Sequence, residues 1–149
     1  MKFKFSLEAV LKHRKTLEEI AKRDYLEEKH KANEQLKKLN FLYAQIDEAR
    51  KGAAAKSGGK KVFIEDLQYI NSFISNQNIK IEIQKIVFRE AMQVTEEKEE
   101  ILLEAAREFK VIEKLKERRF EEHKKRARKT EIRNLDEMVT LRHGRDPLK

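Results

Sequence analysis

The side chains in this sequence that could do chemistry are four histidines, one glycine–lysine stretch and many adjacent carboxylates. The histidines are scattered, and none is paired with another at the four-residue spacing that metal-binding helices use. We therefore expect all four on solvated helix faces, with no metal: His13, His30, His123 and His143. The chain has no cysteine, which excludes disulfides and zinc–thiolate sites.

The stretch GGKK, which begins at Gly58, suggests at first a phosphate-binding loop. Gly52 and Gly58 are one residue too far apart for that motif, no Ser or Thr follows the lysine, and no buried strand precedes it. Adjacent carboxylates such as Glu96 and Glu97 are frequent, but a catalytic carboxylate needs burial to shift its pKa. A thin helical molecule offers no such pocket, so no enzyme activity and no cofactor are predicted.

The composition indicates a long helix or a coiled coil. Of 149 residues, 42% are charged and 39% are hydrophobic, with four glycines, one proline and no tryptophan. So few turn-forming residues, together with dense charge, are typical of long helices. Intrinsic disorder is the alternative for so charged a chain, but the regular spacing of leucine, isoleucine and phenylalanine argues against it.

One break in composition divides the chain. The stretch KGAAAKSGGKK, residues 51–61, holds three of the four glycines and no large apolar residue. It predicts two helices, over about residues 6–51 and 62–143, joined by a turn over about 52–61. Apolar residues recur every few positions in the first helix: Leu7, Val10, Leu11, Leu17, Ile20, Ala21, Tyr25, Ala32, Leu36, Leu39, Leu42, Tyr43, Ile46 and Ala49.

The second predicted helix carries a cleaner heptad seam. Alternating steps of three and four residues give Leu67, Ile70, Ile74, Gln77, Ile81, Gln84, Phe88, Ala91, Thr95, Lys98, Leu102, Ala105, Phe109 and Ile112. The polar members Gln77, Gln84 and Lys98 are expected to set the register of the helix pair at some cost in stability.

Beyond Ile112 the same frame reads Lys116, Arg119 and His123, and the apolar pattern fails. A first helix of the predicted length covers this seam and no more. The second helix would then overhang by about 30 residues, or about 45 Å. The prediction is an all-α fold, a single elongated antiparallel two-helix coiled-coil hairpin over residues 1–149 whose second helix is longer than the first. Gly144 and Pro147 are expected to end that helix.

Two phenylalanines at the start of the chain are predicted to fix the entry into the first helix. With Ser6 as N-cap, Phe5 and Val10 have the spacing of a hydrophobic staple, and Glu8 suits the helix dipole. Phe3 is left over as a further contact residue.

Positive charge is concentrated near the end of the chain. The net charge is +8, and residues 107–129 hold eleven Lys or Arg against five Glu. Such a block attracts acidic protein surfaces, nucleic acid or acidic lipid. The stretch KKRARK, residues 124–129, has only Phe120 as a nearby aromatic, whereas nucleic-acid binding by stacking uses interleaved aromatics. A solvated or protein-facing role is favoured over nucleic acid. With no apolar run long enough for a membrane span or a signal peptide, a cytoplasmic protein is expected.

Several stretches resemble the family of the flagellar export protein FliJ, small coiled-coil components of the bacterial flagellar type III export apparatus. They are FKFSLEAVLKHRK at the start (through Phe3, Phe5, Leu7, Leu11 and Arg14), EQLKKL at 34–39, LQYINSFI at 67–74, EKLKERR at 113–119 and NLDEMV at 134–139. Together they extend over nearly the whole chain.

The resemblance implies a fold similar to the central stalk of rotary ATPases and three kinds of partner. These are the hexameric flagellar export ATPase, whose pore such a protein is thought to enter, the cytoplasmic domain of the export-gate membrane protein, and export chaperones. The protein would then lie at the cytoplasmic face of the inner membrane, held there by its partners. The gate-binding residues that the resemblance implies are Gln35, Leu39, Leu42, Ile46 and Phe73.

The predicted overhang and the resemblance meet in one hypothesis, that the basic arm binds the export ATPase. Charge would come from Arg118, Arg119, Arg126 and Arg128, and apolar contact from Phe120, Leu135 and Met138. Two other classes of function stay open at this point: a basic coiled coil that binds nucleic acid, and a homodimeric rod whose helices pair between chains.

Overall fold

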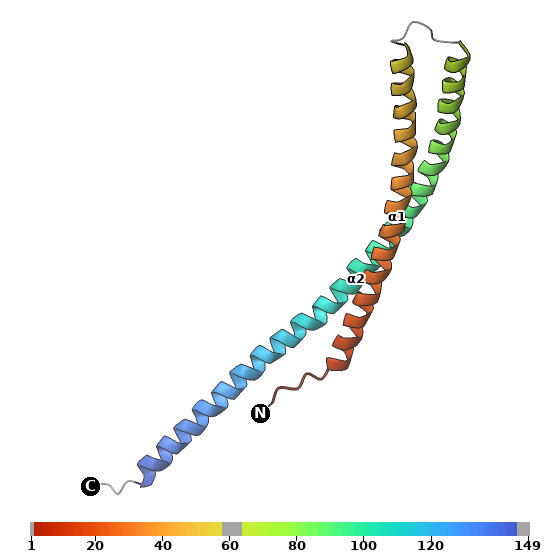
Figure 1. Cartoon of the computed structure of the whole chain (residues 1–149). Helices are drawn as coiled ribbons and strands as arrows, with labels where there is room; N and C mark the ends of the chain where they lie inside the picture. Colours follow the sequence, from red (N-terminus) through yellow and green to blue (C-terminus); the bar gives the residue numbers. More distant parts are fainter. Residues whose placement is uncertain (1, 58–63, 146–149) are drawn as a thin grey trace. The chain divides into compact units, whose positions relative to one another are not determined.

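The computed structural model describes residues 2–57 and 64–145 and consists of two helices in that part of the chain (Figure 1). They are α1 (Glu8–Ser57), with 50 residues, and α2 (Ile64–Arg145), with 82 residues. The contacts divide them into two units: unit 1 combines Met1–Glu18 with Glu104–Lys149, and unit 2 spans Glu19–Leu103. Within each unit the helices pack antiparallel. The prediction of an all-α fold with a longer second helix is confirmed.

The two helices pair within one chain. In unit 2, Gln45 contacts Gln77 and Gln35 contacts Gln84, so residue numbers fall along α1 as they rise along α2. The side chains that meet belong to the same molecule. The structure therefore has the pairing of a hairpin.

The first helix runs further than predicted through the glycine-bearing stretch. It includes Gly52, which was expected in the turn, and ends at Ser57. None of the described glycines has a positive φ. Three alanines follow Gly52, and alanine has the highest helix propensity, so one exposed glycine does not end the helix. The rest of the predicted turn, with GGKK, lies outside the described residues, as does Pro147.

The core of unit 2 is a small cluster at heptad positions. Leu39 and Ile46 of α1 pack with Ile81 of α2, and Leu42 and Ile74 lie against this cluster. Ile81 is 2% exposed. The predicted seam of α2 is confirmed, because every one of its positions from residue 70 to residue 112 is buried or half-buried, while Leu67 is exposed.

Polar side chains within this seam bridge the two helices. The Gln77 amide donates to Oε1 of Gln45 at 2.5 Å. The Gln84 amide donates to both the side-chain and the backbone oxygen of Gln35, at 2.8 and 3.0 Å. Gln77 is buried, and its own Oε1 has no hydrogen-bond partner in the described part of the chain. Such bonds form in one register only, at the cost of desolvating the amides.

The seam of α1 follows a strict heptad frame that passes through charged residues. Its members, all buried or half-buried, are Leu7, Leu11, Arg14, Glu18, Ala21, Tyr25, Glu28, Ala32, Gln35, Leu39, Leu42, Ile46, Ala49 and Ala53. Five members of the predicted apolar stripe are instead exposed: Val10, Leu17, Ile20, Leu36 and Tyr43. Long charged side chains bury their aliphatic stems and leave their charged ends accessible, so they can occupy seam positions.

Candidate binding arm of the second helix

The helix pairing continues in unit 1 at the point where the apolar pattern of α2 fails. Lys116 forms an ion pair with Glu8 at 2.9 Å, and Arg14 forms an ion pair with Glu108. Lys116 is the first residue of the frame after Ile112, so the frame goes on with charged contacts in place of apolar ones. The expectation that coverage ends at Ile112 is therefore wrong.

Residues before α1 extend the coverage by two further turns of α2. The Phe3 ring lies 5.3 Å from the Phe120 ring and 5.5 Å from the His123 ring, measured between centroids. The guanidinium of Arg119 lies 5.7 Å from the centroid of the Phe5 ring, and Phe5 itself is buried. Aromatic pairs of this kind contribute about 0.5–1.5 kcal/mol beyond their buried area. We call residues Phe3–Ser6 the N-terminal clasp.

Ser6 belongs to this clasp and does not cap α1. Its hydroxyl accepts a hydrogen bond from Arg119 at 2.9 Å. At the start of the helix, the Phe5 carbonyl accepts from the Glu8 amide at 3.2 Å and the Leu7 carbonyl accepts from the Leu11 amide at 2.9 Å. The serine hydroxyl therefore links the chain start to α2, and the prediction of Ser6 as N-cap is corrected.

The uncovered part of α2 begins at Lys124. Every side chain from Lys124 to Gly144 is exposed, whereas His123 is half-buried. We call residues Lys124–Gly144 the bare arm; its roughly 20 residues span about 30 Å, against the 45 Å expected. In Figure 1 it is the blue end of α2, which continues past the start of α1.

The bare arm has the composition of a binding surface. Ile132, Leu135 and Val139 follow one another at steps of three and four, which is the spacing of a paired seam. They and Met138 are between 54% and 65% exposed. The arm also holds seven Lys or Arg against three Asp or Glu. A helix that exposes an apolar stripe among cations is typical of a site for a protein partner.

The structure divides the residues predicted to bind the ATPase into two groups. Arg126, Arg128, Leu135 and Met138 lie on the bare arm, and Arg126 is 3.9 Å from Glu122. The remaining three, Arg118, Arg119 and Phe120, lie before it. Arg119 and Phe120 contact the clasp, so the expectation that Phe120 is uncovered is corrected: its ring packs on Phe3.

The residues predicted to bind the export gate lie together in unit 2, with unequal access to solvent. Leu39 and Ile46 are buried in the core cluster against Ile81 of the same chain. Gln35 bonds to Gln84, whereas Leu42 and Phe73 are half-buried. Gln35, Leu42 and Phe73 therefore have side chains partly accessible to solvent, whereas Leu39 and Ile46 do not.

A groove beside these residues offers a more accessible surface. It has a volume of about 560 Å³, and its apolar lining comes from Phe41, Leu42 and Ile83. Phe41 and Ile83 are 62% and 59% exposed. The rest of the lining is polar or charged: Glu34, Lys37, Lys38, Lys80 and Gln84. Sequence patterning missed this groove because Phe41 and Ile83 stand outside both seams.

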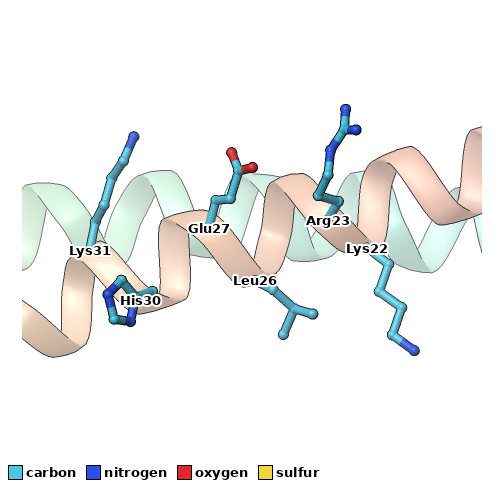
Figure 2. A pocket seen from close by; sticks show the side chains of 6 residues that line it. All are labelled: Lys22, Arg23, Leu26, Glu27, His30 and Lys31. Atoms are coloured by element: carbon cyan, nitrogen blue, oxygen red, sulfur yellow. The ribbon is translucent and has the colours of Figure 1, made fainter.

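A second hollow in unit 2 has no catalytic character. Figure 2 shows its lining as two rows on α1, Lys22–Leu26–His30 and Arg23–Glu27–Lys31, and its volume is about 590 Å³. Because all six side chains come from one helix, it is a surface trough.

Elsewhere in unit 2, the hydrogen bond from Lys85 to Glu82 raises the pKa of Lys85, with a smaller contribution from Tyr43, so this lysine stays protonated. Among the described residues, no group of His, Asp and Glu could hold a metal ion.

These features define a coiled-coil hairpin with exposed apolar and basic side chains on its second helix. The family model described as flagellar FliJ protein matches residues 3–147, so the chain belongs to the flagellar FliJ family. The family has a role in flagellar protein export, and this role extends to the chain. Comparison with curated proteins found no match, and comparison with solved structures found none. No helix in the described part is apolar enough over sufficient length to cross a membrane.

Proposed function

We propose that this protein is a non-catalytic component of flagellar export that binds the hexameric export ATPase through its bare arm. The observation that carries the proposal is the exposure of the whole arm, in which an apolar stripe at heptad spacing has no covering segment among the described residues. Burying such a stripe gains about 25 cal/mol for each Å² of apolar surface. A partner that covers Leu135 and Met138 would supply that burial.

The charge of the arm suits an acidic binding surface on the ATPase. Arg126 and Arg128 are exposed, and arginine pairs with carboxylates through two parallel hydrogen bonds. Exposed charges interact over about 10 Å at ~0.1 M salt, so the association rate should fall as salt rises. Arg118, which is exposed on α2 before the bare arm, would contribute to this steering.

The test is capture of the purified export ATPase by the full chain and by a chain that ends at His123. We expect the shortened chain to lose capture by about tenfold or more. The Leu135→Ala/Met138→Ala variant should lose about as much, because it removes the apolar contact and leaves the charge. Its matched control is Ile79→Ala/Ile86→Ala, which truncates two similarly exposed apolar residues of unit 2. Undiminished capture by the chain that ends at His123 would remove the bare arm from the proposal.

We further propose that the export gate binds unit 2 at the groove around Phe41 and Leu42, with Phe73 nearby on α2. Leu39, Ile46 and Gln35 would act there by holding the helices in register, because their side chains face α2. Phe41→Ala should weaken binding of the gate's cytoplasmic domain without changing the unfolding midpoint. Leu39→Ala should lower both. Equal binding by the Phe41→Ala variant and the wild type would contradict this assignment.

In this scheme the protein works in the cytoplasm, and its association with the inner membrane runs through the gate. Escort of export chaperones is the third proposed activity. Its support is the family membership, and co-purification of a chaperone with the full chain tests it.

A further inference from the structure

A cavity forms in unit 1 where the start of the chain crosses α2. Its volume is about 480 Å³. The lining residues come from two segments that are far apart in the sequence: Lys2, Phe3 and Lys4 before α1, and Arg119, Glu122, His123 and Arg126 on α2. The cavity is distinct from the heptad seam of α2 and from the apolar stripe of the bare arm, because its lining includes no residue of that stripe.

The charge of the cavity is strongly unbalanced. Lys2, Lys4, Arg119 and Arg126 line it with four positive charges, and Glu122 supplies one negative charge. Arg126 lies 3.9 Å from Glu122, so that carboxylate is already engaged. Arg119 donates to Ser6 through one nitrogen, and a guanidinium has five N–H donors. The cavity therefore has donors left for an anionic ligand.

The arrangement of the lysines favours several negative charges along an extended chain. From Lys2 to Phe5, exposure alternates between exposed lysines and covered phenylalanines. This is the pattern of an extended segment, whose alternate side chains point the same way about 7 Å apart. Carboxylates two residues apart on an extended acidic peptide have the same spacing. The arginines on α2 offer forked donors for further carboxylates.

The aromatic side chains argue against a nucleic-acid ligand. Phe3 and Phe120 pack on each other at a tilt of 60°, with ring centroids 5.3 Å apart, and the Lys124 ammonium lies 4.5 Å from the centroid of the Phe120 ring. Both rings are thus already engaged in contacts within the chain, whereas single-stranded nucleic acid stacks its bases on free aromatic faces. Phosphate sites usually converge backbone N–H groups at a helix N-terminus, but the cations here stand on long side chains from two segments.

We infer that this cavity binds a short acidic segment, rich in Asp or Glu, of a protein partner. The inference rests on the proposed function in one respect: Arg119 and Arg126 were assigned to ATPase binding, and the acidic segment would dock at the base of the same arm. It adds Lys2 and Lys4 as binding residues and gives the partner segment its chemistry. The N-terminal clasp would then bind the partner in addition to packing on α2.

The experiment is a titration of the full chain with fluorescein-labelled octaglutamate, followed by fluorescence anisotropy at low salt. The test variant is Lys2→Gln/Lys4→Gln. Its control is Lys125→Gln/Lys129→Gln, which makes the same charge change on the bare arm outside the cavity. Two exposed ion pairs of about 0.5 kcal/mol each predict a loss of about fivefold for the test variant. The control should lose less than about twofold. Equal losses, or none, would overturn the inference.

Three further measurements keep the outcome unambiguous. Inorganic phosphate and a twelve-residue oligothymidylate are tested as competitors, and displacement by the oligonucleotide at a lower concentration than by unlabelled octaglutamate would assign the cavity to nucleic acid and overturn the inference. Circular dichroism of each variant checks the fold. Capture of the export ATPase by the wild type is measured beside the titration. Failure of capture refutes the proposed function, whereas failure of Lys2→Gln/Lys4→Gln to weaken peptide binding refutes the acidic-segment site.

Discussion

The core of unit 2 and the bare arm have the same kind of apolar spacing, but the apolar side chains are buried in the core and exposed on the arm. Ile81 stands in a heptad frame and is 2% exposed, whereas Leu135 stands in one and is 60% exposed. Both stretches have large apolar residues, so residue type does not explain this difference in exposure. What differs is whether a segment of α1 lies opposite. Heptad spacing thus identifies a face that can be buried, and the extent of α1 and the clasp along α2 decides which part of it is buried within the chain.

The most direct test of this comparison is to truncate one apolar side chain in each region. Ile81→Ala should lower the free energy of unfolding by about 2–5 kcal/mol, because it opens a cavity in the core cluster. Leu135→Ala should change it by less than about 0.5 kcal/mol, because the side chain is exposed. Urea unfolding followed by circular dichroism measures both. Comparable losses would mean that the arm is covered in solution.

The clasp supplies a second, smaller contrast. Phe5→Ala should cost about 1.5–3 kcal/mol, because a buried ring leaves the surface of α2. Phe41→Ala, at an exposed position, is the control and should cost less than about 0.5 kcal/mol. Hydrogen exchange should also become faster in the α2 segment around Arg119 in the Phe5→Ala variant alone. If exchange there were unchanged, the clasp would not be what protects that segment.

The buried amide of Gln77 allows a third comparison, between a buried and an exposed polar position of α2 within unit 2. Gln77→Leu removes an unsatisfied buried oxygen and should raise the free energy of unfolding by about 1 kcal/mol. Gln45 is half-buried, so its amide can turn to water. The control Asn78→Leu, next to it on the exposed side, should have little effect. A loss of stability in Gln77→Leu would show that the bond to Gln45 outweighs the unpaired oxygen.

The smallest expected effect belongs to the helical glycine. A Cβ at Gly52 would meet nothing within 4 Å. Gly52→Ala should therefore stabilise the chain by about 0.5–1 kcal/mol, since alanine loses less conformational freedom in a helix. The midpoint of thermal unfolding reports this change. A lower midpoint would place residue 52 outside the helix in solution.

Much of the fold could be predicted from the sequence, because the seam of α2 is apolar and regular. The same method failed where charged residues take seam positions. Arg14 and Glu28 of α1 follow the heptad frame, as do Lys116 and Arg119 of α2, but a search for apolar residues passes over them. A strict count from Leu7 would have found the frame of α1.

The candidate arm was predictable in kind but not in extent. A basic helix end beyond the apolar seam could be seen in the sequence, and the exposure of residues 124–144 agrees with it. Its starting point could not be predicted, because it depends on Phe3 and Phe5 lying across α2. Such a contact joins residues more than a hundred positions apart, and no local pattern indicates it.

Hydrogen exchange along α2, with and without the hexameric export ATPase, tests the central claim most directly. In the free protein we expect fast exchange at residues 124–144 and slow exchange around Ile81. Addition of the ATPase should slow exchange at residues 124–144 and leave the core unchanged. Slow exchange of the arm in the free protein, or no change on adding the ATPase, would contradict the account.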